Sequence, residues 1–351
     1  MKMAAIATAV TTVLVSSSVL AAEVYNSDGT SLSIGGRAEF RGDFVGQESG
    51  ATLDGTMDNK SRFRLNVGGE TQINDSLSAV AFYEGEQSVK NSNTKDNNDT
   101  FTQRYMYAGL GSNDNVVTFG KQDAATVQIS QMSDNVSTYS GIQKTYINAG
   151  DEQINNAINY SGYFMDALSL KASYLASNEA NQDGYALSGI YTIPFGLGIG
   201  LGYAANDNDG DQQDSKQFLG GLSYQWESLY VAATYTQGQG SKKYNLGDND
   251  FHGTEFVARY MFDNGFQAIV GYQKGTIDPD AGDKFDVSNY VELTGQYYFN
   301  KNIISYLSYK FNNLDQGDMC EGCGSSPSNV NASYFTDDAD NSLRLGLLYL
   351  F

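Results

Sequence analysis

Residues 32–44 read LSIGGRAEFRGDF, and their alternation decides the fold. Every second residue from Leu32 to Phe44 is apolar or glycine. The opposite phase carries four charged residues: Arg37, Glu39, Arg41 and Asp43. Because successive side chains of a β-strand point to opposite faces, this stretch predicts a strand with one apolar and one charged face.

The same alternation recurs along the chain, for example in residues 61–71, 168–174 and 287–299. In the last of these, Val287 is expected on the apolar face together with Val291 and Leu293. Segments of this kind number about sixteen, which suits a large β-barrel. A short turn near residues 127–132 is the one helical feature that we expect. No linker or change of composition divides the chain, so the sequence predicts one domain.

Two architectures use such strands. In a soluble sandwich the apolar face forms the core, whereas in a membrane barrel it meets lipid and the charged face lines water. Short and long connections alternate here, as a membrane barrel requires. The short ones are 73–76, 165–167, 194–195, 227–228, 263–265 and 300–302, and the long, acidic ones include 206–215, 238–250 and 313–340. The sequence therefore predicts an all-β, antiparallel transmembrane barrel.

The N-terminus indicates export. Residues 1–21 contain one Lys, no acidic residue and an apolar stretch, and Val19 and Ala21 suit the −3 and −1 positions of a signal-peptidase site. We therefore expect a cleaved signal peptide at 1–21 and a barrel domain at 22–351. A transmembrane anchor is the weaker interpretation, because the apolar run is short and is interrupted by Thr and Ser.

Composition excludes several classes of function. The chain has 41 acidic and 21 basic residues, a net charge of −20, which argues against binding nucleic acid. A single His and two Cys leave little for a His-rich metal site or a Ser-His-Asp hydrolase. We expect no enzyme activity, no metal site and no cofactor.

Five stretches carry a resemblance to a known family: AEVYNSDG (22–29), GETQIN (69–74), AGL (108–110), FGK (119–121) and YYFNKN (297–302). They resemble the trimeric general diffusion porins of Gram-negative outer membranes, and the resemblance extends over residues 22–351. It implies a 16-stranded β-barrel whose third external loop folds into the lumen. It also implies a homotrimer in outer-membrane lipid and lipopolysaccharide, and passive diffusion of ions and small hydrophilic solutes.

The last strand resembles the signal that the outer-membrane assembly machinery reads. Leu343, Leu345, Leu347, Tyr349 and Phe351 share one face. Tyr349 and Phe351 are the residues we assign to this signal. Such a strand also closes the barrel and leaves no free edge.

The resemblance places a pore constriction at Arg37, Arg64, Arg104 and Asp134. The first three match wall arginines of the family, and Asp134 matches the first acidic position of the third loop, residues 122–152. The alternation agrees for the arginines, because an arginine facing lipid at the midplane costs about 2–4 kcal/mol. The alternative is that these arginines simply neutralise carboxylates in the lumen.

Further lumen positions are Arg41, Arg62, Glu84 and Lys121. The loop departs from the family where relatives have Glu and Pro, because this chain has Thr138 and Ser137. These departures reduce the local field. With the large negative net charge, they predict a weak preference for cations.

Two other motifs have simpler interpretations. Cys320 and Cys323 lie in the last long loop of an exported protein, so we expect a local disulfide rather than a redox or zinc site. Glycines alternate with apolar residues in GLGIGLG (196–202), which we interpret as close strand packing at a subunit contact.

Competing functions are an enzyme built on a barrel, an adhesin or phage receptor that uses the external loops, and a channel specific for one solute. An enzyme would need catalytic residues clustered at the rim, and a specific channel would show an aromatic track. Tyr290, Tyr298 and Tyr306 are the candidates for such a track. The general channel for hydrophilic solutes is the leading hypothesis.

Overall fold

The computed structural model describes residues 21–45, 57–89, 100–112, 114–134, 139–178, 182–207, 214–240, 249–279, 284–314 and 341–351. Three predictions lie outside these residues. They are the signal peptide up to residue 20, the disulfide between Cys320 and Cys323, and the loop positions Ser137 and Thr138.

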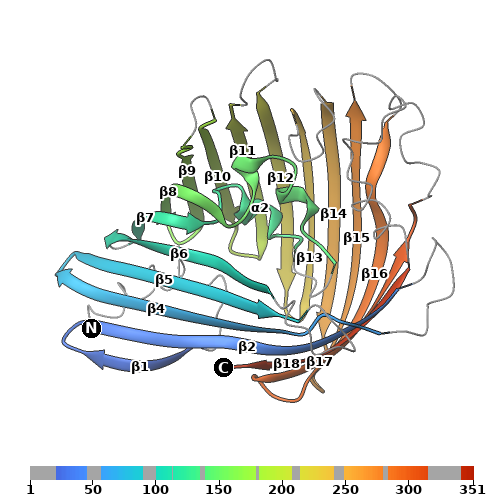
Figure 1. Cartoon of the computed structure of the whole chain (residues 1–351), viewed down its shortest axis with the longest axis horizontal. Coiled ribbons are helices and arrows are strands. Elements are labelled where there is room, and N and C mark those ends of the chain that lie inside the picture. Colours follow the sequence, from blue (N-terminus) through green and yellow to red (C-terminus); the bar gives the residue numbers. More distant parts are fainter. Residues whose placement is uncertain are drawn as a thin grey trace.

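The described chain is almost entirely one antiparallel sheet (Figure 1). Its strands are β1 (Ala22–Ser27), β2 (Thr30–Val45), β3 (Asp58–Asn59), β4 (Arg62–Asn74), β5 (Leu77–Ser88), β6 (Thr100–Ser112), β7 (Asn115–Gln122), β8 (Ile154–Phe164), β9 (Leu168–Leu175), β10 (Gly184–Thr192), β11 (Leu197–Asn206), β12 (Ser215–Trp226), β13 (Leu229–Gln239), β14 (Asn249–Met261), β15 (Phe266–Pro279), β16 (Phe285–Tyr298), β17 (Ile303–Asn312) and β18 (Ser342–Leu350). The helical segments are α2 (Val127–Ser130), η1 (Ile142–Lys144) and η2 (Asn148–Gly150). No helix in the described part of the chain is long and apolar enough to cross a membrane.

The sheet closes on itself because the two ends of the chain share one edge of β2. Strand β18 pairs with β2 from Val45 down to Arg37, and β1 pairs with the same edge from Ile34 to Thr30. β1 and β18 thus lie end to end as one barrel strand, and β3 continues β4 in the same way. Counted so, the described residues form sixteen barrel strands, and the predicted fold class is confirmed.

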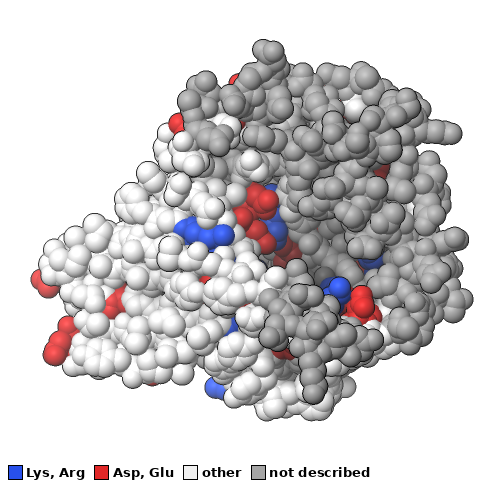
Figure 2. Space-filling model, in the orientation of Figure 1, with Lys and Arg blue, Asp and Glu red and all other residues white. Residues whose placement is uncertain are grey.

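Burial is inverted relative to a soluble protein. On β2, Phe40 is 45% exposed whereas its neighbour Glu39 is 5% exposed, and the same contrast separates Phe63 from Asn66 on β4. Apolar side chains therefore face outward and polar ones inward, as lipid outside and water inside require. In the space-filling view, charged side chains of both signs gather at the hollow near the centre (Figure 2).

The third long connection folds inward, as expected. It joins β7 to β8 and packs on the inner wall through two apolar clusters. One cluster joins Val127 and Tyr146 of the loop to wall residues such as Phe251, and the other joins Ile129 and Met132 to Leu219 and Val257. The helical turn predicted near residues 127–132 is α2.

The sequence suggested a subunit contact at the glycine run of β11, but the structure places Gly200 and Gly202 against the third loop. Gly200 and Gly202 face the lumen, where α2 presses against them. A Cβ atom on Gly200 would lie 2.8 Å from the Met132 sulfur and 2.9 Å from Ile129 Cδ1. The glycines therefore make room for the third loop inside the barrel.

The assignment of Val287 to the lipid face was also wrong. The register of β15 and β16 shifts between Gly275 and Thr276, and Val287 is the extra residue opposite this shift. A β-bulge of this kind reverses the phase of the strand. Val287 is therefore buried beside Tyr146 of the loop instead of facing lipid.

The C-terminal residue completes the ring. The Phe351 N–H donates to Gly36 O at 3.1 Å, and Gly36 N–H donates to Phe351 O at 2.9 Å. Its ring stacks on Phe63 and Tyr349, with 5.9 Å between centroids in both pairs. A side chain at Gly36 would collide with this arrangement, because a Cβ there would lie 2.8 Å from the Phe351 ring and 2.2 Å from Arg64 O.

We predict that Gly36→Ala lowers the free energy of unfolding by about 1–3 kcal/mol, the usual cost of overpacking. Urea unfolding of the folded protein in detergent micelles measures this change. Gly69→Ala on the neighbouring strand is the control, because its Cβ would meet nothing closer than 3.8 Å. Equal stability of the two variants would contradict the tight closure at Gly36.

Candidate functional site

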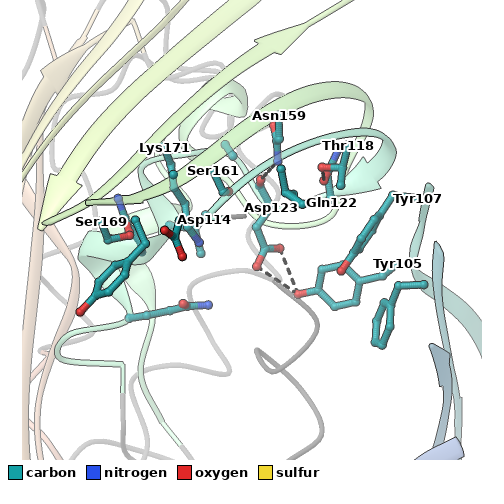
Figure 3. A pocket seen from close by; sticks show the side chains of 18 residues that line it. Tyr105, Tyr107, Asp114, Thr118, Gln122, Asp123, Asn159, Ser161, Ser169 and Lys171 are labelled. Atoms are coloured by element: carbon teal, nitrogen blue, oxygen red, sulfur yellow. Dashed lines mark hydrogen bonds between the residues drawn. The ribbon is translucent and has the colours of Figure 1, made fainter. Parts of the chain in front are cut away.

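The root of the third loop is fixed by Asp123 (Figure 3). Tyr105 Oη on β6 donates to its two carboxylate oxygens at 3.0 and 3.2 Å, and the Gln153 N–H donates to it at 3.0 Å. Asn159 Nδ2 on β8 donates to its backbone oxygen at 2.8 Å. Burial, reinforced by the nearby charge of Glu152, raises the pKa of Asp123 above its usual value. Both ends of the loop are thus tied to one carboxylate.

The acidic position of the loop is paired within the loop itself. Asp134 accepts hydrogen bonds from the Lys144 ammonium and the Ser140 hydroxyl. Lys144 also lies 3.3 Å from Glu152 Oε2. Burial alone would lower the pKa of Lys144, but Asp134 and Glu152 outweigh it and raise that pKa above its usual value. Lys144 therefore stays cationic and neutralises part of the loop's negative charge.

Beyond Asp134, the loop crosses to strands β16–β18 and is held there through Tyr139. The Ser342 hydroxyl donates to Tyr139 Oη at 2.8 Å, and Tyr290 Oη donates to the Tyr139 backbone oxygen. The Arg344 guanidinium lies 4.2 Å from the centroid of the Tyr139 ring, a cation–π contact. Arg344 in turn donates two hydrogen bonds of 2.7 Å to Asp43 on β2.

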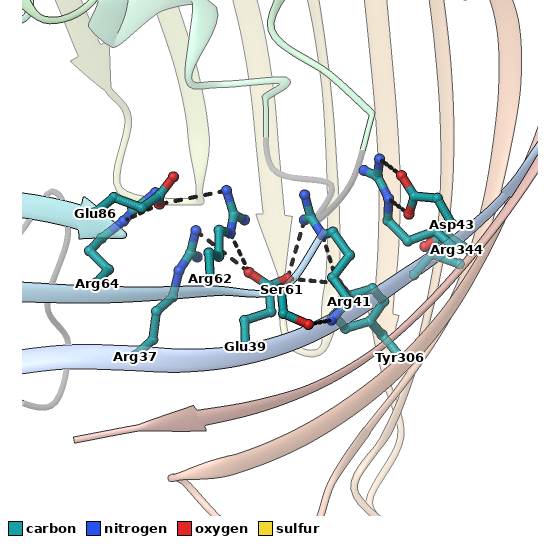
Figure 4. Close-up of polar contacts among 12 residues, drawn as sticks. Arg37, Glu39, Arg41, Asp43, Ser61, Arg62, Arg64, Glu86, Tyr306 and Arg344 are labelled. Atoms are coloured by element: carbon teal, nitrogen blue, oxygen red, sulfur yellow. Dashed lines mark hydrogen bonds and ion pairs between the residues drawn. The ribbon is translucent and has the colours of Figure 1, made fainter. Parts of the chain in front are cut away.

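The wall of β2, β4, β5 and β6 carries a row of alternating charges, which we call the arginine ladder: Arg37, Arg41, Arg62, Arg64, Arg104, Glu39, Glu84 and Glu86. Figure 4 shows its members on β2 and β4 together with Glu86. Glu39 accepts from Arg62 Nε at 2.5 Å and lies 3.2 Å from Arg41 and 3.9 Å from Arg37.

The ladder continues onto β5 and β6 through two glutamates. Glu86 accepts two hydrogen bonds from Arg64, at 2.6 and 2.9 Å. Glu84 has a fully buried side chain, lies 3.5 Å from Arg64 Nη1 and accepts from Arg104 Nε at 2.8 Å. Each glutamate therefore joins at least two arginines.

A β-bulge brings Arg104 into the arginine ladder. Glu84 pairs with Tyr105 and Gly85 with Gln103, which leaves Arg104 as the extra residue of β6. Both Arg104 and Tyr105 therefore point into the lumen. One contacts the ladder and the other holds the loop root.

Comparison with known proteins agrees with this geometry. A family model described as Gram-negative porin matches residues 4–317. The chain belongs to the Gram-negative porin family.

Relatives of the porin support the same conclusion. Outer membrane protein U of Vibrio vulnificus is 35% identical over 372 residues that span both chains in full. Porin-like protein L of Photobacterium profundum is 32% identical, over 88% of this chain and 92% of its own. The porin is thus an outer-membrane protein that forms a channel for passive diffusion.

A solved structure, "Salmonella typhi OmpF complex with Daunomycin", superimposes with a TM-score of 0.79 at 23% identity. It covers 94% of this chain and all of its own. This likeness concerns the fold, and it agrees with the sixteen-stranded barrel described above.

The structure brings most of the predicted site residues of the porin together. Arg41 and Arg62 lie in the ladder with the three matched arginines, and Glu84 is the carboxylate between two of them. Lys121 is not brought to the ladder. It pairs with Met106, whose side chain is 53% exposed on the outer face.

Sequence reasoning did not assign Glu86, Arg344 or Lys144, all of which face the porin lumen. Glu86 follows Glu84 at a spacing of two, and Arg344 lies between the outward Leu343 and Leu345, so alternation could have found both. Lys144 carried no such signal, because its place depends on how an irregular loop folds.

We predict that Glu84→Gln shifts the reversal potential of the porin in a salt gradient toward anions. The substitution leaves Arg64 and Arg104 with less compensating charge, so the wall becomes more positive. Planar-bilayer recordings measure the shift. Glu70→Gln is the control, a lumen-side residue of β4 outside the ladder. A larger shift for Glu70→Gln would contradict the role assigned to Glu84.

Proposed function

We propose that the porin is a general channel with a weak preference for cations, and that its narrowest section lies between the arginine ladder and the third loop. The observation that carries this proposal is the pairing of charges on both sides. Neither side offers an uncompensated row of one sign, so the section should filter weakly by charge.

The wall side has a small positive excess. Its five arginines are accompanied by three glutamates, which leaves two positive charges. Arg344 and Asp43 add one of each sign. The loop side has a negative excess, because Asp134 and Glu152 share the cation of Lys144, and Asp123 and Asp151 add two further carboxyl groups to the same loop.

Opposed charges of this kind favour hydrophilic solutes. They order water across the pore, and an apolar solute would have to displace that water without replacing its hydrogen bonds. Selection by charge then takes place mainly at the two mouths of the pore. The chain's net charge of −20 concentrates cations there, within about 10 Å at 0.1 M salt.

A channel specific for one solute has less support. The three candidate tyrosines for an aromatic track make polar contacts: Tyr306 Oη donates to Glu39 at 2.6 Å, Tyr298 Oη donates to Gln296 Oε1 at 3.2 Å, and Tyr290 holds the loop. An adhesin or receptor role of the external loops would be additional to the channel and is not favoured by a particular contact.

We further propose a homotrimer with lipopolysaccharide contacts, assembly through Tyr349 and Phe351, and cleavage before Ala22. A solved relative in this fold, OmpT of Vibrio cholerae, is titled as a trimer form and superimposes with a TM-score of 0.67. The start of β1 at Ala22 suits the proposed cleavage. Intact mass and native mass spectrometry of the purified protein test both points.

Liposome swelling tests the general channel. Neutral sugars should enter at rates that fall smoothly with their size, because nothing in the proposed section selects one of them. A sharp preference for one sugar would contradict the proposal.

We predict that Lys144→Met increases the preference for cations. The substitution removes the cation that neutralises Asp134 and Glu152, so the loop side becomes more negative. The ratio of cation to anion permeability from reversal potentials measures this. Lys274→Met is the matched control, because Lys274 pairs with Asp286 at 3.0 Å rather than with Asp134 or Glu152. An equal change in both variants would argue against a role for the loop charges.

We also predict an asymmetric dependence of ion preference on pH. The raised pKa of Lys144 keeps its charge as pH rises from about 7 to about 9, so Lys144 itself should not change the preference there. Asp123 has a raised pKa and therefore loses its charge at a higher pH than an ordinary aspartate, whose pKa is about 3.9. The cation preference should decline on acidification, and Asp123→Asn should reduce that decline.

A further inference from the structure

A recess of about 300 Å³ opens between the third loop and the wall of β5–β9 (Figure 3). Volumes near this size are at the lower end of those that bind small molecules. The loop contributes Asp123, Ala124, Val127, Gln128 and Gln131, the turn before β7 contributes Asp114, and strands contribute most of the remaining residues. None of the predicted constriction residues lines it, so it is separate from the arginine ladder.

One side of the recess presents unoccupied donors. Ser161 on β8 pairs directly with Lys171 on β9, and directly opposed residues have Cβ atoms about 4.5–5.5 Å apart. Within the described residues, the Lys171 ammonium makes no hydrogen bond or ion pair, and Asp123 acts on it only at a distance. An ammonium and a hydroxyl at this spacing can be bridged by one carboxylate.

The other side presents acceptors. Asn159 precedes Ser161 by two residues on β8, so the two side chains point into the same space. Asn159 Oδ1 is buried and has no hydrogen-bond partner among the described residues. A buried acceptor without a partner costs about 1–3 kcal/mol. The Asp123 carboxylate lies in the same recess, next to Asn159, which donates to its backbone.

A third wall is aromatic. Phe82 and Tyr107 have ring centroids 5.5 Å apart, and Phe82 and Tyr105 have theirs 6.3 Å apart. All three side chains are buried and line the recess. They offer an apolar surface beside the acceptors. In Figure 3, Lys171 and Ser161 lie on one side, and Asn159, Asp123 and Tyr105 on the other.

The recess lies toward the end of the barrel with the short turns. Asp114, which lines it, belongs to the turn between β6 and β7, and Gly162 and Tyr163 come shortly before the turn at 165–167. Tyr105 is the residue after Arg104 of the ladder. A solute that has passed the ladder therefore meets the recess next.

We propose that this recess is a binding subsite for a small zwitterion, a free α-amino acid or short peptide, held while it passes through the channel. Its carboxylate lies between Lys171 and Ser161, and its ammonium lies at Asn159 Oδ1 and Asp123. An aliphatic side chain lies against Phe82 and Tyr107. The proposal depends on the channel function only for access to the recess.

Charge favours a zwitterion over a simple ion. Asp114 and Asp123 together outnumber Lys171, so a plain anion is repelled, and a plain cation leaves Lys171 without a partner. A neutral sugar would satisfy Asn159 Oδ1 but would leave the ammonium of Lys171 poorly compensated. Only a ligand with both charges a few bonds apart satisfies donors and acceptors together.

Single-channel recording of the full-length mature porin with L-leucine tests the proposal. Leucine should produce transient interruptions of the current. L-leucinamide, isovalerate and glucose at the same concentration serve as probes for a cation, an anion and a polyol. Their interruptions should be about tenfold shorter or absent, the expected loss when a hydrogen bond to a charged group is missing.

Variants separate binding from folding. Lys171→Met should shorten the leucine interruptions about tenfold and Ser161→Ala severalfold, whereas Lys171→Arg should largely retain them. Lys274→Met, which removes a lysine elsewhere, should leave them unchanged. All four should keep the open-channel conductance, which shows that the barrel has formed.

Three results would overturn the inference. They are no interruption by leucine, equal interruption by isovalerate or glucose, and unchanged interruptions in both Lys171→Met and Ser161→Ala. Failure of the channel function itself would look different, since the wild-type protein would then give no conductance steps at all.

Discussion

In the hydrocarbon core of a membrane, a backbone N–H or C=O without a hydrogen-bond partner costs several kcal/mol, because no water can replace that partner. A sheet satisfies this constraint only by closing into a ring. Here the ring closes on β2, where β18 and β1 share one edge and Phe351 adds the last pair of hydrogen bonds with Gly36. Every other feature of the porin depends on this closure, since it separates a face toward lipid from a face toward water.

Separation of the faces explains where the charges lie. Ionised side chains cannot face lipid at the midplane, so the alternation of β2, β4 and β5 sends them into the lumen, where Arg37 pairs with Glu39 and Arg64 pairs with Glu84. The third loop then has an apolar surface of its own to cover, and it does so against the inner wall, where the glycines of β11 leave space for α2. The charged side chains and the third loop, which the barrel places in the lumen, therefore determine its properties as a channel.

Much of this could be predicted from the sequence. Alternation assigned the faces of residues 62–66 correctly, and the spacing of polar segments located the short turns and the long loop before β8. Alternation failed to predict the structure where contacts between distant parts of the chain decide the position of a side chain. The bulge at Val287 reverses which side chains of β16 face inward, and the alternation of the sequence gives no sign of it. The role of Gly200 depends on a helix that lies far away in sequence. The pairing of Asp134 with Lys144 depends on the course of an irregular loop, whose sequence has no repeating pattern of apolar and polar residues.

The shared strand of β1 and β18 has a consequence for the chain as a whole. Phe351 bonds to Gly36 and Ala22 pairs with Ile34, so the two ends of the barrel domain meet two residues apart on one neighbour. In its hydrogen bonding the barrel is therefore almost a circle without a first or last strand. The hydrogen bonds of the barrel do not depend on which strand comes first in the sequence. Loss of either β1 or β18 would open the ring at the same edge of β2.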